Sequence, residues 1–276
     1  PIGIRARSRR GNGGWPPDGV PRRTAEIALA YASVCIAMPG AGPVPDWGDL
    51  DGELARQILP DGGHVSRNPA LLPEILALLL PLRQSYARLG VAPPPELISA
   101  IDRMLPAVRF YRLGDGAFAR FNGVATTPHD LVATVLRYDD THGVTPADAS
   151  HSGYHRIEHG PTVVLMDTGL PAAGQLSTAA HAGCLSFEMS DGRCPVIVNC
   201  GAPAMPAPEA TLAARATAAH STATINDTSS CRFGTGGMMG RYLGGRVVSG
   251  PQEVNVGRRD DGDATTVTAN HDGYLR

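Results

Sequence analysis

The sequence predicts a multidomain protein in which α-helices come first and an antiparallel β-sandwich follows. Between residues 50 and 113 apolar residues recur at helical spacing, whereas after Asp115 and Gly116 the apolar period becomes two. Helices that precede the strands, instead of alternating with them, indicate segregated domains rather than a parallel α/β sheet. We therefore expect a poorly patterned, unassigned stretch at 1–49, a helical segment at 50–113 and a sandwich at 114–276.

The helical segment is predicted from apolar spacing and from residues that start or stop helices. Leucines and isoleucines at i, i+3 and i+4 predict a helix from residue 71 that ends at Gly90, a typical C-cap. The prolines at 93–95 start the next helix, which Pro106 is expected to kink. Two apolar-faced helices joined by a short loop indicate an antiparallel pair. Further helices are expected at 23–38 and, capped by Asp49 or Asp51, at 53–59.

Short segments of period two, separated by turn residues, predict the sandwich. Their β-branched and aromatic residues favour strands, and many short strands at this spacing are typical of antiparallel sandwiches. The expected strands are 117–121, 131–138, 153–157, 162–167, 185–190, 196–200, 222–225 and 244–249.

Composition excludes several classes of function. A net charge of −2 and a pI near 6.5 argue against a nucleic-acid partner. All 24 basic residues are arginine, which excludes a Schiff-base lysine and a P-loop. The longest apolar run stops at Pro81, so no membrane span is expected. The chain starts at Pro1 and stops within a repeating pattern, and we expect it to be a fragment. Its five cysteines do not indicate a compartment.

One hairpin near the middle of the second half carries most of the candidate chemistry. His181 lies at its mouth, Asn199 near its end, and His220 starts a later strand. A two-residue turn at Asp191 and Gly192 would turn Asn199 away from the face of Leu185. A three-residue turn that includes Arg193 would place Asn199 in line with His181, because a slip of one residue exchanges the faces of a strand. Both registers remain open from sequence.

The pattern around this hairpin resembles the β-domain of the heparinase II/III-like family of polysaccharide lyases. The matching segments are His181-Ala-Gly-Cys-Leu-Ser-Phe-Glu188, Val198-Asn-Cys-Gly201, Ala219-His-Ser221, Ser152-Gly-Tyr154, Asp167-Thr-Gly169 and His271-Asp-Gly-Tyr274. Upstream, 61–69 resembles an Asp-Gly segment of the family's helical toroid. The resemblance spans about residues 50–276. It implies the C-terminal end of an (α/α) toroid followed by an antiparallel β-sandwich.

The resemblance also implies an activity, namely a carbon–oxygen lyase that cleaves uronic-acid polysaccharides by β-elimination in a bacterial periplasm or cell envelope. The reaction needs a group that neutralises the uronate carboxylate, a base and an acid. The candidate catalytic residues are His64, Arg67 and His181, with Arg67 and Tyr154 as binders of an acidic polysaccharide. The family's zinc ligands correspond to His181, Asn199 and His220, so a zinc ion is the one cofactor suggested.

Several departures from the family pattern support an alternative. The family's Tyr-His pair corresponds to Leu71 and Leu72, which cannot transfer protons, and an acidic position corresponds to Gly183. Neutral Asn199 is a poor zinc ligand beside a carboxylate. The alternative is a non-catalytic carbohydrate-binding or cell-envelope relative, and a weaker one is a purely structural module. In that case the histidines are structural, Arg67 is solvated or caps a helix, and Tyr154 packs in the sheet. The sequence does not indicate an oligomeric state.

Overall fold

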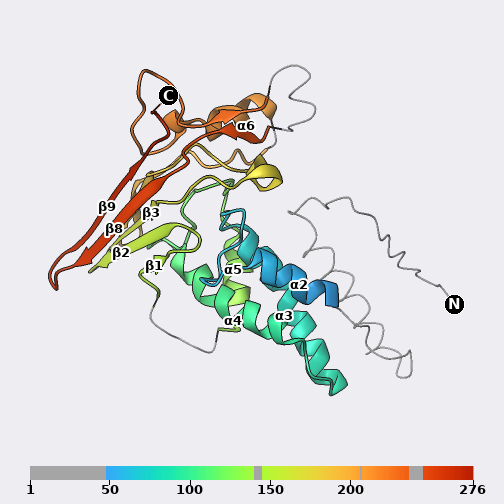
Figure 1. Ribbon diagram of the computed structural model, residues 1–276. Helices are drawn as coiled ribbons and strands as arrows, with labels where there is room; N and C mark the ends of the chain where they lie inside the picture. Colours follow the sequence, from blue (N-terminus) through green and yellow to red (C-terminus); the bar gives the residue numbers. More distant parts are fainter. Residues whose placement is uncertain (1–47, 140–144, 206, 236–244, 276) are drawn as a thin grey trace.

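The computed structural model describes residues 48–139, 145–205, 207–235 and 245–275. In these ranges a helical layer is followed by antiparallel sheets, in the predicted order (Figure 1). The helices between residues 48 and 136 lie together on one side of the molecule, and the strands of the main sheet lie on the other. The helix predicted at 23–38 lies outside the described residues. Within the described ranges, no helix is both long and apolar enough to cross a bilayer.

Three helices form the first part of the helical layer: α2 (Gly48–Gln57), α3 (Leu71–Leu89) and α4 (Pro95–Phe110). The predicted leucine stripe of α3 is buried, and α3 packs against α4 as an antiparallel neighbour would. Gly90 ends α3 in the left-handed region at φ 66°, where its N–H donates to the carbonyl of Ala87. Helix α2 begins earlier than the predicted residue 53. Asp49 and Asp51 therefore lie within the helix, and neither caps its start as predicted.

A fourth helix, α5 (His129–Leu136), replaces the strand predicted at 131–138, which was wrong. Its buried residues Val132 and Val135 are three apart, the spacing of one helical face, and α5 packs against α3 and α4. The strand predicted at 117–121 is also absent from this region, where Phe118 makes only an isolated bridge with Arg112. The helical layer therefore includes residues beyond 113.

The main sheet is antiparallel, with the strands in sequence order. Along β3, Val163, Leu165 and Asp167 are buried, and the first two join a single core with the helices. The residues between them are half-buried on the opposite face, as the pleat requires. The strands are β1 (Asp148–Ala149), β2 (Tyr154–His159), β3 (Thr162–Asp167), β4 (Phe187–Asp191) and β5 (Cys194–Ile197).

The β4–β5 hairpin follows neither of the two predicted registers. Asp191 lies opposite Cys194, so the turn consists of Gly192, at φ 52°, and Arg193. A bulge then shifts the register by one residue, so that Met189 lies opposite Ile197. Because of this bulge, no simple count from the turn gives the position of Asn199.

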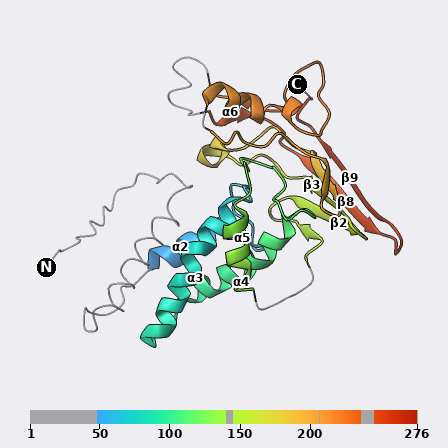
Figure 2. The same ribbon diagram turned by 180° about the vertical axis from the view of Figure 1, so that it is seen from behind.

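The rest of the described chain forms two small antiparallel pairs and short helices. The long hairpin of β8 and β9 was not predicted, and it lies beside β2 and β3 in both views (Figures 1 and 2). Arg258 of β8 donates to the carbonyls of Ala147 and Arg156, which ties the hairpin to the main sheet. Residues 222–225, predicted as a strand, make only one bridge, between Ile225 and Thr228. The elements are α6 (Pro208–Arg215), β6 (Arg232–Phe233), β7 (Val247–Ser249), β8 (Val254–Asp260) and β9 (Thr265–His271).

Candidate functional site

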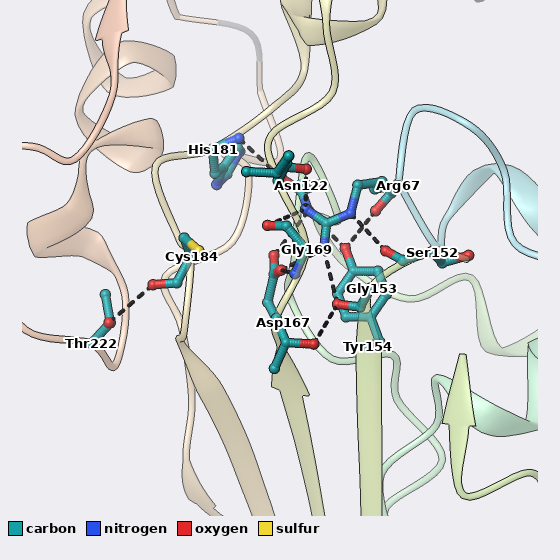
Figure 3. Close-up of polar contacts among 12 residues, drawn as sticks. Arg67, Asn122, Ser152, Gly153, Tyr154, Asp167, Gly169, His181, Cys184 and Thr222 are labelled. Atoms are coloured by element: carbon teal, nitrogen blue, oxygen red, sulfur yellow. Dashed lines mark hydrogen bonds and ion pairs between the residues drawn. The ribbon is translucent and has the colours of Figure 1, made fainter. Parts of the chain in front are cut away.

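The candidate residues gather where the loop between α2 and α3 meets the ends of β2 and β3 (Figure 3). Arg67 lies in this loop with a left-handed backbone, φ 61°, which is unusual for a residue with a side chain. Its side chain enters the sheet region and is 9% exposed. The loop is also attached through Asp61, whose carboxylate accepts hydrogen bonds from the N–H and the hydroxyl of Ser152 at 2.6 and 2.8 Å.

Arg67 uses its guanidinium within the protein. Nε donates to the carbonyl of Ser152 at 2.7 Å, and Nη1 donates to those of Gly169 and Leu170 at 3.2 and 2.9 Å. Nη2 donates to the carbonyl of Gly153 at 3.2 Å and forms an ion pair with the carboxylate of Asp167. A guanidinium has five N–H donors, and these five contacts leave none for a substrate carboxylate.

Asn122 and Tyr154 complete the network around the ion pair. The Tyr154 hydroxyl donates to the carbonyl of Arg67 at 2.7 Å and accepts from Asn122 Nδ2 at 2.7 Å. Asn122 Nδ2 also lies 3.2 Å from Asp167 Oδ2, and its Oδ1 accepts from the backbone N–H of His181 at 3.1 Å. The Arg67 guanidinium lies over the Tyr154 ring, 4.7 Å from its centre. One connected network therefore joins the helical loop, both strands and the segment that carries His181.

Burial determines the protonation of this network. It raises the pKa of Tyr154 well above 10, so its hydroxyl stays protonated and a hydrogen-bond donor at neutral pH. Burial alone would lower the pKa of Arg67, but the neighbouring Asp167 carboxylate raises it above the ordinary value. Arg67 and Asp167 thus form a charged pair that neutralises itself inside the protein.

His64 is turned away from this network, into the helical layer. Its Nδ1 lies 2.7 Å from Ser66 Oγ and its Nε2 lies 2.9 Å from Gln57 Oε1, so both ring nitrogens are hydrogen-bonded. The side chain is buried, and burial lowers its pKa to about 4. A neutral imidazole with both nitrogens engaged is poorly placed to exchange a proton with a ligand.

The structure brings His181 and His220 together. His181 Nδ1 lies 3.0 Å from His220 Nε2, and His220 Nδ1 lies 2.8 Å from the carbonyl oxygen of Ala216. Asn199 reaches this region through Ser221, whose backbone N–H and hydroxyl donate to Asn199 Oδ1 at 2.8 and 3.1 Å. Among the residues that the structure describes, the buried Asn199 Nδ2 atom has no hydrogen-bond partner.

These residues supply a poor ligand set for the zinc suggested by the resemblance. Structural zinc normally has four ligands, commonly thiolates and imidazoles. The two histidines supply two, and the Asn199 amide oxygen already accepts two hydrogen bonds. Across the ranges that the structure describes, no three His, Cys, Asp or Glu side chains are arranged to hold a metal ion. The residues present therefore do not fit a zinc site, and the proposed function does not use zinc.

An open cavity of about 670 Å³ lies next to the Arg67 network. Its walls come from three segments: the turn before β2, the end of β3, and β8. Leu170 and Val256 are 43% and 41% exposed and give the cavity apolar surface. The polar lining residues that extend beyond the Arg67 network are His151, His155, Gln252, Glu253 and Arg258.

The sequence identified some of these residues and missed others. Arg67 and Tyr154 are in contact, as are His181 and His220, whereas His64 belongs to a separate cluster. Asn122 and Asp167 were not predicted as site residues, although Asp167 is part of a segment that resembles the family. Leu72 is fully buried in the helical core, and its neighbour Leu71 packs against the core.

Residues 141–276 match the family described as Heparinase II/III-like, C-terminal. The chain is 35% identical over 260 residues to FtsZ-localized protein C of Caulobacter vibrioides, covering 92% of this chain and 44% of that protein.

Solved structures with the same fold include a heparan sulfate lyase HepC mutant from Pedobacter heparinus, with a TM-score of 0.68, 15% identity, and coverage of 91% of this chain and 42% of that one. A heparinase III matches with a TM-score of 0.68, 14% identity, and coverage of 97% and 43%. The chain thus spans less than half the length of these proteins. The predicted fold class, the end of a helical toroid followed by an antiparallel sandwich, is confirmed.

Proposed function

The chain belongs to the heparinase II/III-like family, and from this membership we propose that the protein is a non-catalytic, glycan-binding member of it. One observation carries the proposal: the polar side-chain atoms of Arg67, Tyr154 and His64 are used in internal hydrogen bonds. Arg67 has no remaining donor, the Tyr154 hydroxyl both donates and accepts, and both nitrogens of His64 are engaged.

β-Elimination requires polar groups that are free to contact the substrate. A lyase must hold the uronate carboxylate with a free cation or polar group and must exchange protons with the substrate. The leucines at the positions of the family's Tyr-His pair cannot exchange protons, and Leu72 is fully buried. The network around Arg67 is better suited to joining the helical layer to the sheet than to catalysis.

The cavity beside this network is the proposed binding site for an acidic polysaccharide. The exposed surfaces of Leu170 and Val256 suit the C–H faces of a sugar ring, and His151 suits its hydroxyl groups. The similarity to FtsZ-localized protein C supports a further part of the proposal, localization of this protein with FtsZ, for which binding rather than catalysis would be the useful property.

A second candidate is an active lyase of uronic-acid polysaccharides. The observation that favours it is the shared fold with proteins named as a heparan sulfate lyase and a heparinase III. In that case His181 would serve as the base, since it is the one predicted catalytic residue with a ring nitrogen, Nε2, for which no hydrogen bond is recorded among the described residues.

The two candidates are separated by one pair of measurements on the purified protein. A panel of uronic-acid polysaccharides is incubated with the protein, and ultraviolet absorbance follows the unsaturated product while calorimetry follows binding. We expect binding without an absorbance increase. An absorbance increase that is lost in His181→Ala would establish the lyase, and the absence of both signals would overturn both candidates.

A matched pair of variants tests the position of the binding site. Val256→Glu places a longer, negatively charged side chain in the cavity at an exposed residue, and Val248→Glu makes the same change at a residue that is 53% exposed and does not line the cavity. We expect Val256→Glu to abolish binding of the acidic glycan and Val248→Glu to retain it. Equal binding by both variants would place the glycan elsewhere.

A further inference from the structure

The histidine pair connects two segments that are distant in sequence. His181 precedes β4, and His220 directly follows η2 (Thr217–Ala219), so the two residues are 39 positions apart. Both side chains are buried, at 5% and 8% exposure. The rings meet edge to face with centres 5.1 Å apart, and the only polar contact between them is the 3.0 Å approach of His181 Nδ1 to His220 Nε2.

Hydrogen-bond donors and acceptors fix the positions of the protons in this pair. The Ala216 carbonyl only accepts, so His220 Nδ1 must carry a proton. Both rings are buried, neither is hydrogen-bonded to a carboxylate of the described residues, and the guanidinium of Arg215 already donates to Ala180, next to His181, so an added positive charge on either ring is disfavoured and both are neutral. In a neutral His220 with a protonated Nδ1, Nε2 is an acceptor. His181 Nδ1 must therefore be the donor.

A metal ion held between the two facing nitrogens would require the opposite arrangement on His181. A ligand nitrogen must offer its lone pair to the metal, so His181 Nδ1 would have to lose its proton, which would move to Nε2. The surroundings oppose this exchange. The buried guanidinium of Arg215 donates to the carbonyl of Ala180, next to His181, and a divalent ion would add positive charge close to it.

Gly183, which stands where the family has an acidic residue, has no room for a side chain. A Cβ atom at Gly183 would lie 2.8 Å from His220 Cδ2 and 3.2 Å from its Nε2, so a side chain there would displace the ring. The buried Ser186 Oγ, which has no hydrogen-bond partner within the described part of the chain, lies 3.2 Å from the same point. The His220 ring thus packs against Gly183 and also contacts the ring of His181 directly.

We infer that this chain has exchanged metal ligation for a direct hydrogen bond between two neutral histidines, both in the Nδ1–H tautomer. The pair then joins the segment before β4 to the segment after η2 without a bound ion. This inference does not depend on the proposed glycan-binding function, because the pair does not line the cavity.

The test is a nitrogen-15 NMR measurement of the imidazole tautomers in the purified chain, before and after addition of one equivalent of zinc chloride. We expect His181 and His220 to show Nδ1–H tautomers that zinc does not change, and a melting temperature that a chelator does not change. Zinc bound at one ion per chain with a changed nitrogen-15 signal from either histidine, or an Nε2–H tautomer of His181, would overturn the inference.

Two variants assign the nitrogen-15 signals to individual histidines and show whether bound zinc depends on the pair. His181→Ala removes one ring of the pair, and His159→Ala, at an exposed position outside the pair, is the matched control. We expect equal, substoichiometric zinc in the wild type and both variants. Zinc that is lost in His181→Ala and kept in His159→Ala would restore the metal site and overturn the inference. Because the tautomer measurement uses the wild type, a variant that fails to fold does not prevent the test.

Discussion

Replacement of Arg67 by alanine should be among the most destabilising single changes in the described chain. It removes the guanidinium from a pair whose side chains are 9% and 4% exposed and leaves the carboxylate of Asp167 buried without its cation. Removing one partner of a buried ion pair typically costs about 3–5 kcal/mol. Four backbone carbonyls also lose a donor, so the upper part of that range is expected.

The expected loss is large enough to measure by two independent methods. For a protein of this size it corresponds to a fall in melting temperature of roughly 10 °C. Urea denaturation followed by circular dichroism gives the free energy of unfolding directly. Arg67→Lys should recover only part of the loss, because an ammonium group has three donors and cannot reproduce the planar fork.

A matched control separates this effect from the general loss of an arginine. Arg259 also forms an ion pair, with Asp261 at 2.7 Å, but the two side chains are 77% and 52% exposed. Arg259→Ala should therefore leave the melting temperature unchanged within error. If Arg67→Ala were as stable as Arg259→Ala, the conclusion that Arg67 holds the helical loop to the sheet would be refuted.

Three other changes test separate parts of the structure, and thermal or urea denaturation measures each of them. Burial raises the pKa of Glu188 from 4.5 to about 7. Because the folded protein then binds a proton that the unfolded chain has lost, the free energy of unfolding should fall by roughly 3 kcal/mol as pH rises through that interval. Glu188→Gln should remove this pH dependence, and an unchanged dependence would contradict its attribution to Glu188. Gly183→Ala should lower the melting temperature because its Cβ meets the buried ring of His220, whereas Gly257→Ala, with open space around it, should not. Tyr154→Phe should cost about 1–3 kcal/mol by leaving buried polar groups unpaired, and a cost near zero would argue against the network.

The long apolar helices and the central strands were predictable because their patterns are local. The leucine stripe of α3 and the alternation in β3 give the correct element with nearly the correct bounds. Helix α5 was not predictable, since eight residues rich in β-branched side chains fit a strand as well as a helix, and contact with α3 and α4 decides between them. The β8–β9 hairpin was missed because its strands are mostly exposed and polar.

The candidate site was only partly predictable, because the partners of its residues are distant in sequence. Arg67 meets Asp167 across 100 residues and the Gly169 carbonyl across 102, and no local pattern around Arg67 indicates these contacts. The approach of His181 to His220 was expected from the resemblance. The position of Asn199 depended on a bulge between Met189 and Ser190, which the turn sequence does not reveal.

The Arg67 contacts bear on how the chain can be divided. A cut near Leu113, where the sequence pattern changes, would leave the guanidinium on one piece and its carboxylate on the other, each charged and newly exposed to water. It would also separate Asp61 from Ser152. The helices and the sheet should therefore melt as a single cooperative unit. The sheet expressed without residues 61–67 would lack the side chains of Asp61 and Arg67, which bond to Ser152 and Asp167 at the ends of β2 and β3.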